Sequence, residues 1–172
     1  PTKEDSVCPK SVFPLSNRPV AVGVNGMVSS AHPLASQSGL RMLMDGGNAI
    51  DGAIATAATL NVVEPYMSGL GGIGLALIYT RKDGMVRALN FSGRTAKAAY
   101  PDRFTEESKG TGLISALIPG NVAGWLTMHA KYGTLDLKRV FKPAIDYAQN
   151  GFPITSLNSK IMRSAITRLS EF

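Results

Sequence analysis

Three consecutive residues, Ser92, Gly93 and Arg94, offer the clearest capacity for ligand binding in this sequence. They supply a hydroxyl, a flexible glycine and a guanidinium directly after an apolar stretch that is typical of a buried strand. Ligand-binding groups are common at strand ends, and the planar fork of an arginine suits a carboxylate. The alternative is that Arg94 pairs with a structural carboxylate or lies free on the surface. Residue types alone leave both interpretations open.

Other residues that could do chemistry are poorly placed for it. His32 and His129 lie far apart in the sequence without metal-ligand neighbours, and the single Cys8 lies among prolines. We therefore predict no metal site and no Cys-His pair. No Gly-x-Ser-x-Gly motif is present, and two histidines give little support for a Ser-His-Asp triad. Asp45 and Asp51 flank a turn, where helix capping explains them better than acid–base chemistry.

The glycines at 69, 71 and 74 have the spacing G-x-G-x-x-G. In a dinucleotide-binding fold these glycines follow a strand and precede a helix. Here a helical pattern precedes them and a strand pattern follows, so the order is reversed. We interpret the segment as a tight connection in which backbone approaches other backbone or a ligand. A nucleotide-binding module is kept as a third functional hypothesis.

Periodicity and breaker residues predict the elements that position these groups. We expect strands over 20–24, 73–80 and 85–91, and helices over 33–44, 49–63, 119–131, 136–150 and 157–172. Asp83-Gly84 lies between two apolar runs, which indicates a hairpin. The last helical pattern reaches Phe172 without a cap, which predicts that the native polypeptide continues.

Several details of these elements are predicted as well. Asn48 and Asp51 resemble a capping box, and the small residues that follow favour close packing of that helix on a sheet. The strand that contains Leu77 is apolar on both sides, so we expect it to be covered on both faces. Trp125 and Met128 are expected in the core. Pro143 should kink or divide its helix.

Composition excludes several classes of protein. The 172 residues contain 18 Lys+Arg and 12 Asp+Glu, a net charge of +6, with 44% hydrophobic and 17% charged residues. This balance excludes intrinsic disorder. The basic residues are scattered, so we predict no nucleic-acid partner. The longest weakly charged stretch, 52–63, is shorter than the roughly 20 residues that a membrane span needs.

No signal-peptide pattern opens the chain, so either none is made or it has been removed, and the cellular compartment stays open. We expect an irregular arm over 1–19 and a folded body over 20–172.

Read together, several motifs resemble the gamma-glutamyltranspeptidase family. They occur in family order and together span roughly residues 20–155, which makes chance an unlikely explanation. The matching segments are 26–36, 46–53, 61–65, 68–72, 118–124, 131–135 and 143–153.

The resemblance implies an α+β fold, an αββα sandwich of the N-terminal nucleophile hydrolase type built from two chains. A precursor cleaves itself, and the new N-terminal Thr of the small subunit becomes the nucleophile, with its own α-amine as base. This chain resembles the front part of the large subunit, so the resemblance implies no catalytic residue, metal or cofactor here. The implied partner is the small-subunit chain, and the implied substrate is a small amide such as a gamma-glutamyl compound.

The resemblance also marks a departure at the substrate site. Family members hold the glutamyl carboxylate with the Arg of a Phe-Arg-Glu segment, and that register reads Phe91-Ser92-Gly93 here. Arg94 lies two residues on, and in an extended segment it would return to the same side as Ser92. We therefore assign Arg94, Ser92 and Gly93 to substrate binding. The alternatives are an acylase or amidohydrolase of the same family acting on a non-glutamyl amide, and a catalytically silent structural relative.

Overall fold

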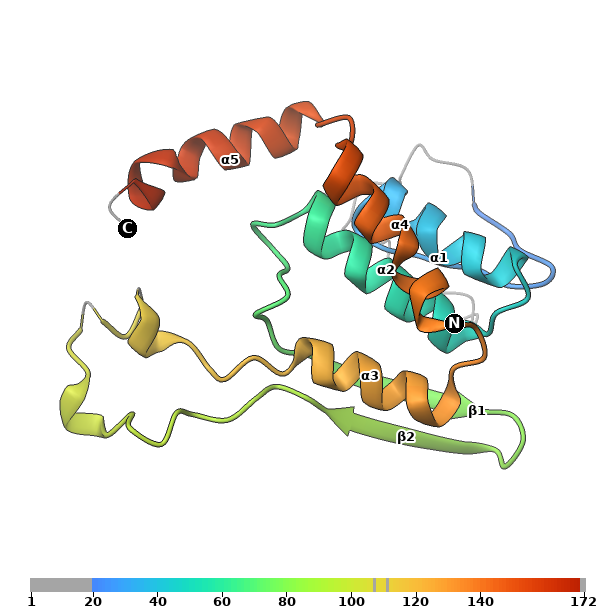
Figure 1. Cartoon of the computed structure of the whole chain (residues 1–172), viewed down its shortest axis with the longest axis horizontal. Coiled ribbons are helices and arrows are strands. Elements are labelled where there is room, and N and C mark those ends of the chain that lie inside the picture. The colour runs from blue at the N-terminus through green and yellow to red at the C-terminus, as the bar shows by residue number, and fades with distance from the viewer. Residues whose placement is uncertain (1–19, 107, 111, 171–172) are drawn as a thin grey trace, which may run out of the picture.

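The first two helices begin at the predicted residues, and each has a side-chain cap. The computed structural model describes residues 20–106, 108–110 and 112–170 (Figure 1); Cys8 and the expected arm over 1–19 lie outside these residues. Helix α1, Pro33–Met44, starts with Pro33 in its first turn, and His32 Nδ1 accepts a hydrogen bond from Leu34 N. Helix α2, Ala49–Val63, starts with the predicted capping box between Asn48 and Asp51. The predicted capping box of α2 is confirmed, whereas the cap that His32 provides for α1 was not predicted.

Helices α1 and α2 pack closely through small residues. A Cβ added to Gly39 would lie only 2.8 Å from the backbone oxygen of Gly52, and one on Gly52 would lie 3.2 Å from that of Gly39. The prediction that the small residues of α2 face a sheet is therefore incomplete. The glycine of α2 faces another helix, because two glycines at one crossing bring two helix backbones together.

The predicted hairpin is confirmed. Strand β1, Leu75–Thr80, pairs antiparallel with β2, Met85–Asn90, and the register sets Leu75 opposite Asn90. Gly84 has φ +66° in the turn, a conformation that glycine adopts without strain. Arg87 pairs with Asp83 across the turn, and this contact steadies the tip of the hairpin.

One face of the hairpin is bare, which corrects two predictions. Leu75, Leu77 and Tyr79 are 75%, 79% and 64% exposed, whereas Ile78 on the other face is buried. Strand β1 is thus covered on one face only by the described residues. The expected strand over 20–24 is also absent, and Val24 is 97% exposed. A strand needs a neighbouring strand to satisfy its backbone, and the described residues provide none for 20–24.

Three further helices complete the described chain. Helix α3, Asn121–Tyr132, lies along the covered face of the hairpin, and α4, Leu137–Asn150, packs on α2 (Figure 1). Pro143 lies inside α4 without dividing it. Helix α5, Ser156–Leu169, extends from the end of α4, and short 3-10 turns occupy Pro101–Arg103 and Leu113–Ser115. No helix among the described residues is both long and apolar enough to cross a bilayer.

The core joins all of α1, α2, α3, α4 and the hairpin. Trp125 and Met128 are buried there, as predicted, and the Trp125 ring packs against Phe141 at a centroid distance of 6.2 Å. The buried members of this cluster are Met42, Ile54, Ala55, Ala58, Ile78, Trp125, Met128, Val140 and Ala144.

Asp51 also joins two turns that are distant in sequence. Its carboxylate is fully buried and accepts hydrogen bonds from Thr134 N at 3.1 Å, from Thr134 Oγ1 at 2.6 Å and from Asn48 N at 2.9 Å. Burial alone would raise the pKa of Asp51, but the hydrogen bonds from Thr134, Asn48 and Leu135 together hold it below its usual value. Asp51 is thus a structural anion, as the capping interpretation predicted.

Candidate functional site

The segment that follows β2 is a tight turn, which we call the Ser92 turn (residues 90–94). Asn90 Oδ1 accepts hydrogen bonds from Ser92 N, at 2.9 Å, and from the Ser92 hydroxyl. Gly93 has φ +78°, and the Arg94 carbonyl accepts a hydrogen bond from Ile118 N at 2.9 Å. An Asn side chain that bonds the backbone two residues on is a common turn device. The local sequence therefore accounts for the turn.

Glycine is required at position 93 for two reasons. The left-handed φ is strained for other residues. A Cβ at Gly93 would also lie far inside 3.0 Å of the Ile118 carbonyl oxygen, closer than real Cβ atoms come. The chain therefore leaves the extended conformation between Ser92 and Arg94. The expectation that Arg94 lies on the same side as Ser92 required an extended segment, and the segment is not extended.

A second segment, residues 69–74, is fixed to the start of α3. The Gly72 carbonyl accepts hydrogen bonds from Gly120 N and Asn121 N, both at 3.1 Å. The buried Asn121 side chain donates from Nδ2 to the Gly69 carbonyl at 3.0 Å. These glycines connect α2 to β1 and present carbonyls to α3. The prediction of a tight connection with close backbone approach is confirmed.

Phe91 joins the Ser92 turn to both neighbours. Its backbone N donates to the Gly74 carbonyl at 3.0 Å. A Cβ on Gly74 or on Gly124 would collide with the Phe91 ring, and one on Gly120 would collide with the Phe91 carbonyl. We call the meeting of residues 69–74, 91–94 and 118–121 the glycine junction. Because bare backbone meets backbone there, the Ser92 turn has a rigid support.

The three predicted site residues therefore lie together on one supported turn. Ser92 is half-buried, while Gly93 and Arg94 are exposed. Among the described residues no carboxylate lies within ion-pair distance of the Arg94 guanidinium. Arg94 thus provides a cation that the described structure does not use.

The two histidines of the described residues are engaged in structural contacts. His32 Nδ1 is occupied by its cap, and His129 Nε2 lies 2.7 Å from the Leu135 carbonyl. Neither histidine is hydrogen-bonded to a Ser or Thr hydroxyl in this part of the chain, and no three His, Cys, Asp or Glu residues gather there as metal ligands.

Comparison with known proteins identifies the family. A sequence model of the family described as gamma-glutamyltranspeptidase matches residues 35–172. The chain belongs to the gamma-glutamyltranspeptidase family. It is 44% identical over 138 residues to the glutathione hydrolase-like YwrD proenzyme of Bacillus subtilis, covering 78% of this chain and 26% of the relative. It is 37% identical over 147 residues to the acylase ACY 1 proenzyme of a Pseudomonas species, with 78% and 26% covered.

Solved structures agree with this family assignment. The gamma-glutamyltranspeptidase of Helicobacter pylori superposes with a TM-score of 0.83 at 34% identity, covering 90% of this chain and 46% of that one. The cephalosporin acylase of Bacillus halodurans gives 0.81 at 36% identity, with 96% and 31% covered. The α+β fold of the N-terminal nucleophile hydrolase type is thereby confirmed. The chain spans about a quarter of the length of the curated relatives it matches.

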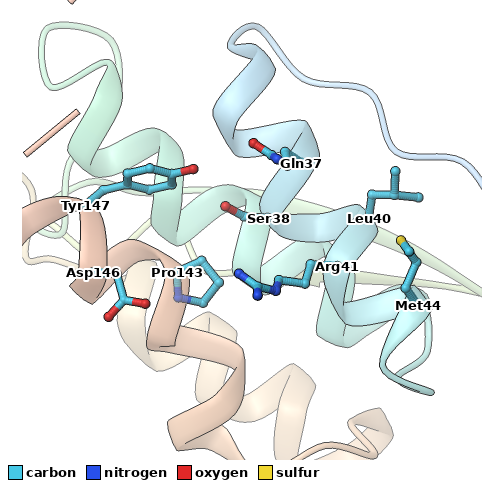
Figure 2. A pocket seen from close by; sticks show the side chains of 8 residues that line it. All are labelled: Gln37, Ser38, Leu40, Arg41, Met44, Pro143, Asp146 and Tyr147. Carbon is cyan, nitrogen blue, oxygen red and sulfur yellow. The ribbon is translucent and has the colours of Figure 1, made fainter. Parts of the chain in front are cut away.

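One hollow in this gamma-glutamyltranspeptidase-family chain lies between α1 and α4, away from the glycine junction. Its volume is about 580 Å³, and Figure 2 shows the side chains from α1 and α4 that line it. Arg41, Gln37 and Tyr147 line it, together with Asp146, which pairs with Lys142 at 2.9 Å. No residue of the glycine junction contributes to it. The hollow therefore provides no evidence for a substrate site at the glycine junction.

Sequence reasoning missed two residues of the site. Asn90 organises the Ser92 turn, and Asn121 fixes the segment 69–74. The spacing of Asn90 two positions before Ser92 is a recognisable turn signal. Asn121 and Gly69 are 52 positions apart in the sequence, so no local sequence pattern predicts their contact.

Proposed function

We propose that this chain is the N-terminal part of the large subunit of a self-processing amide hydrolase or acyltransferase. The observation that carries the proposal is the Ser92 turn, which the glycine junction supports and which presents a guanidinium that no described carboxylate pairs with. Family membership and the relatives named as proenzymes support it. The nucleophile then belongs to a small-subunit chain released from the same precursor.

In the proposed reaction the partner's N-terminal Thr hydroxyl attacks the amide carbonyl, and the α-amine of that Thr accepts the hydroxyl proton. The amide nitrogen takes up this proton and leaves as an amine, so the acyl group stays bound to the Thr oxygen as an ester. Water or a second amine then attacks the ester carbonyl and gives its proton to the α-amine, which passes it to the Thr oxygen as the ester bond breaks. The acyl group leaves as an acid or a new amide, and the Thr hydroxyl is restored. In this scheme Arg94 binds the carboxylate of the acyl group, while Gly93 and Ser92 shape the adjoining wall.

The bare face of the hairpin supports a second layer. Leu75, Leu77 and Tyr79 form an apolar strip on β1 that the described residues leave open to solvent. Large exposed apolar patches mark interaction sites. We assign this strip to packing against the second sheet of the αββα sandwich.

Expression of the full-length precursor tests the proposal. We expect two chains on a denaturing gel and release of p-nitroaniline from gamma-glutamyl-p-nitroanilide. Arg94→Ala should raise KM about 10-fold or more, because a charge-assisted contact to the acyl carboxylate is lost. Arg163→Ala on the exposed side of α5 is the matched control and should leave KM unchanged. A precursor that never splits and never turns over an amide identifies a silent relative instead.

An acylase is the second candidate, since two of the relatives compared above carry that name. The ratio of kcat/KM for glutaryl-p-nitroanilide and gamma-glutamyl-p-nitroanilide separates the two activities. An acylase that takes non-glutamyl groups favours the glutaryl compound.

A further inference from the structure

The described glycines that follow an Asn or Asp differ in how they use their backbone N–H. These pairs are Asn25-Gly26, Asp45-Gly46, Asp51-Gly52, Asp83-Gly84 and Asn150-Gly151. Most of the glycines donate to a carbonyl: Gly46 to Leu43 at 3.2 Å, Gly52 to Asn48 at 3.1 Å, Gly84 to Thr80 at 3.0 Å and Gly151 to Tyr147 at 3.0 Å. Gly26 N has no such partner in the part of the chain that the structure describes. Among these pairs the Gly26 nitrogen is therefore the one available to react.

A backbone nitrogen that follows an asparagine can attack the side-chain amide carbon, which makes asparagine a thermolabile residue. Glycine favours the attack because it has no Cβ to block the approach. A nitrogen whose proton is held in a hydrogen bond reacts slowly. Asn150 is the last residue of α4 and Gly151 is its C-cap, so the end of that helix must unwind before attack. Asn25 lies in an exposed bend outside any helix or strand, so no helix has to unwind there.

The described residues also leave the Asn25 side chain unrestrained. Other asparagine side chains of the described chain are held by hydrogen bonds; they are Asn48, Asn61, Asn90, Asn121 and Asn158. The aspartates of the remaining pairs are held as well, Asp45 by Arg139 at 2.9 Å, Asp83 by Arg87 and Asp51 by Thr134. Asn25 is exposed and makes no side-chain hydrogen bond to a described residue. The pair Asn25-Gly26 thus combines an unrestrained amide with an available nitrogen.

We propose that Asn25 is a site of spontaneous deamidation in the folded protein, with water as the co-reactant. Gly26 N attacks Asn25 Cγ, the Cγ–Nδ2 bond breaks, and Nδ2 leaves as ammonia with the proton that Gly26 N has lost. Water then opens the resulting succinimide ring at one of its two carbonyls. The products are aspartate and isoaspartate, and no atom is oxidised or reduced.

The modification changes the chain where it leads into α1. Both products carry a negative charge at position 25, and isoaspartate lengthens the main chain by one carbon atom. Position 26 lies close to α1, because a Cβ on Gly26 would be 3.1 Å from Leu43 Cδ1. A longer main chain at position 25 shifts this contact. Deamidation therefore alters both charge and packing beside the first helix.

Incubation of the full-length protein at mildly alkaline pH tests the inference, with Asn150 as the internal reference. Peptide mass spectrometry follows the conversion of both asparagines in buffer and in concentrated urea. In the folded protein Asn25 should convert at least about 10-fold faster, because Gly151 must first lose a backbone hydrogen bond. In urea the two rates should lie within about threefold, since each asparagine precedes a glycine and neither keeps its native structure. Equal rates in the folded protein, an intact Asn25, or the same ratio in buffer and in urea overturns the inference.

Matched variants assign the isoaspartate that forms. Asn25→Gln should remove most of it, because glutamine must close a larger ring, whereas Asn150→Gln should leave it unchanged. Isoaspartate is measured by methyl transfer from S-adenosylmethionine with a protein isoaspartate methyltransferase. Gly26→Ala should slow the conversion at Asn25 at least about 10-fold, since its Cβ hinders the attack, and an unchanged Tm shows that this variant still folds. Isoaspartate that is unchanged in Asn25→Gln, or lost in Asn150→Gln, overturns the inference. None of these readouts requires amidase activity.

Discussion

The Asp51 carboxylate holds both the backbone N–H and the hydroxyl of Thr134, a residue 83 positions further along the chain. This single side chain completes the cap of α2 and fixes the turn between α3 and α4. Since α3 also supports the glycine junction at its other end, Asp51 contributes to the frame of the Ser92 turn without approaching it in sequence.

Asp51→Asn should lower the free energy of unfolding by about 2–4 kcal/mol. An amide has one oxygen in place of two, so at least one of the buried donors from Asn48, Thr134 and Leu135 loses its acceptor. The measurement is denaturant or thermal unfolding of the full-length protein. Asp146→Asn, at an exposed pair with Lys142, is the control and should change the stability by less than about 0.5 kcal/mol.

The same carboxylate predicts a dependence of stability on pH. Its pKa is lower in the folded state than in the unfolded chain. Its contribution is therefore complete above the unfolded pKa of about 4 and is lost as the pH falls through the folded pKa. Thermal unfolding between pH 7 and pH 3 should show wild type and Asp51→Asn converging at the acid end. A constant difference in Tm across that range contradicts the prediction.

Gly93→Ala should be far more damaging than Gly46→Ala. Both glycines have positive φ, +78° and +87°, so both substitutions carry a strain of about 1–2 kcal/mol. Gly46 has open space around it, whereas a Cβ at Gly93 collides with the Ile118 carbonyl. We expect the Gly93 variant to lose at least about 1 kcal/mol more, and to lose amidase activity in the processed enzyme. Equal values of Tm for the two variants would contradict the prediction, because they would show that the turn can move away from the Ile118 carbonyl without loss of stability.

Gly124→Ala should be rescued by a smaller side chain at position 91. The added methyl group meets the Phe91 ring, and overpacking of this kind costs about 1–3 kcal/mol. In Phe91→Ala the space is open, so the same Gly124→Ala substitution should be nearly neutral there. Unfolding of the two single variants and the double variant gives the coupling energy. If the losses of stability in the two single variants add up in the double variant, the Phe91 ring does not contact position 124.

Local signals predicted most of this fold. The capping box at Asn48, the proline at the start of α1 and the Asp83-Gly84 turn each fixed an element boundary, because their causes lie within a few residues. The expected strand over 20–24 was wrong, since a strand depends on neighbours that the sequence window does not contain, and the described residues cover β1 on one face only. Ser92, Gly93 and Arg94 lie on one turn, and their role in substrate binding stays a prediction. Their support by Asn121 and Gly124 was not foreseen, because tertiary contacts across tens of residues leave no local pattern.

The bare apolar strip on β1 has a consequence for how the protein is made in the cell. From the moment the hairpin forms until another layer reaches it, Leu75, Leu77 and Tyr79 present a surface to which other nascent chains adhere. Rapid burial of this strip then competes with aggregation during synthesis. The yield of mature protein is expected to depend on chaperones and on growth temperature more than the stability of its individual helices would suggest.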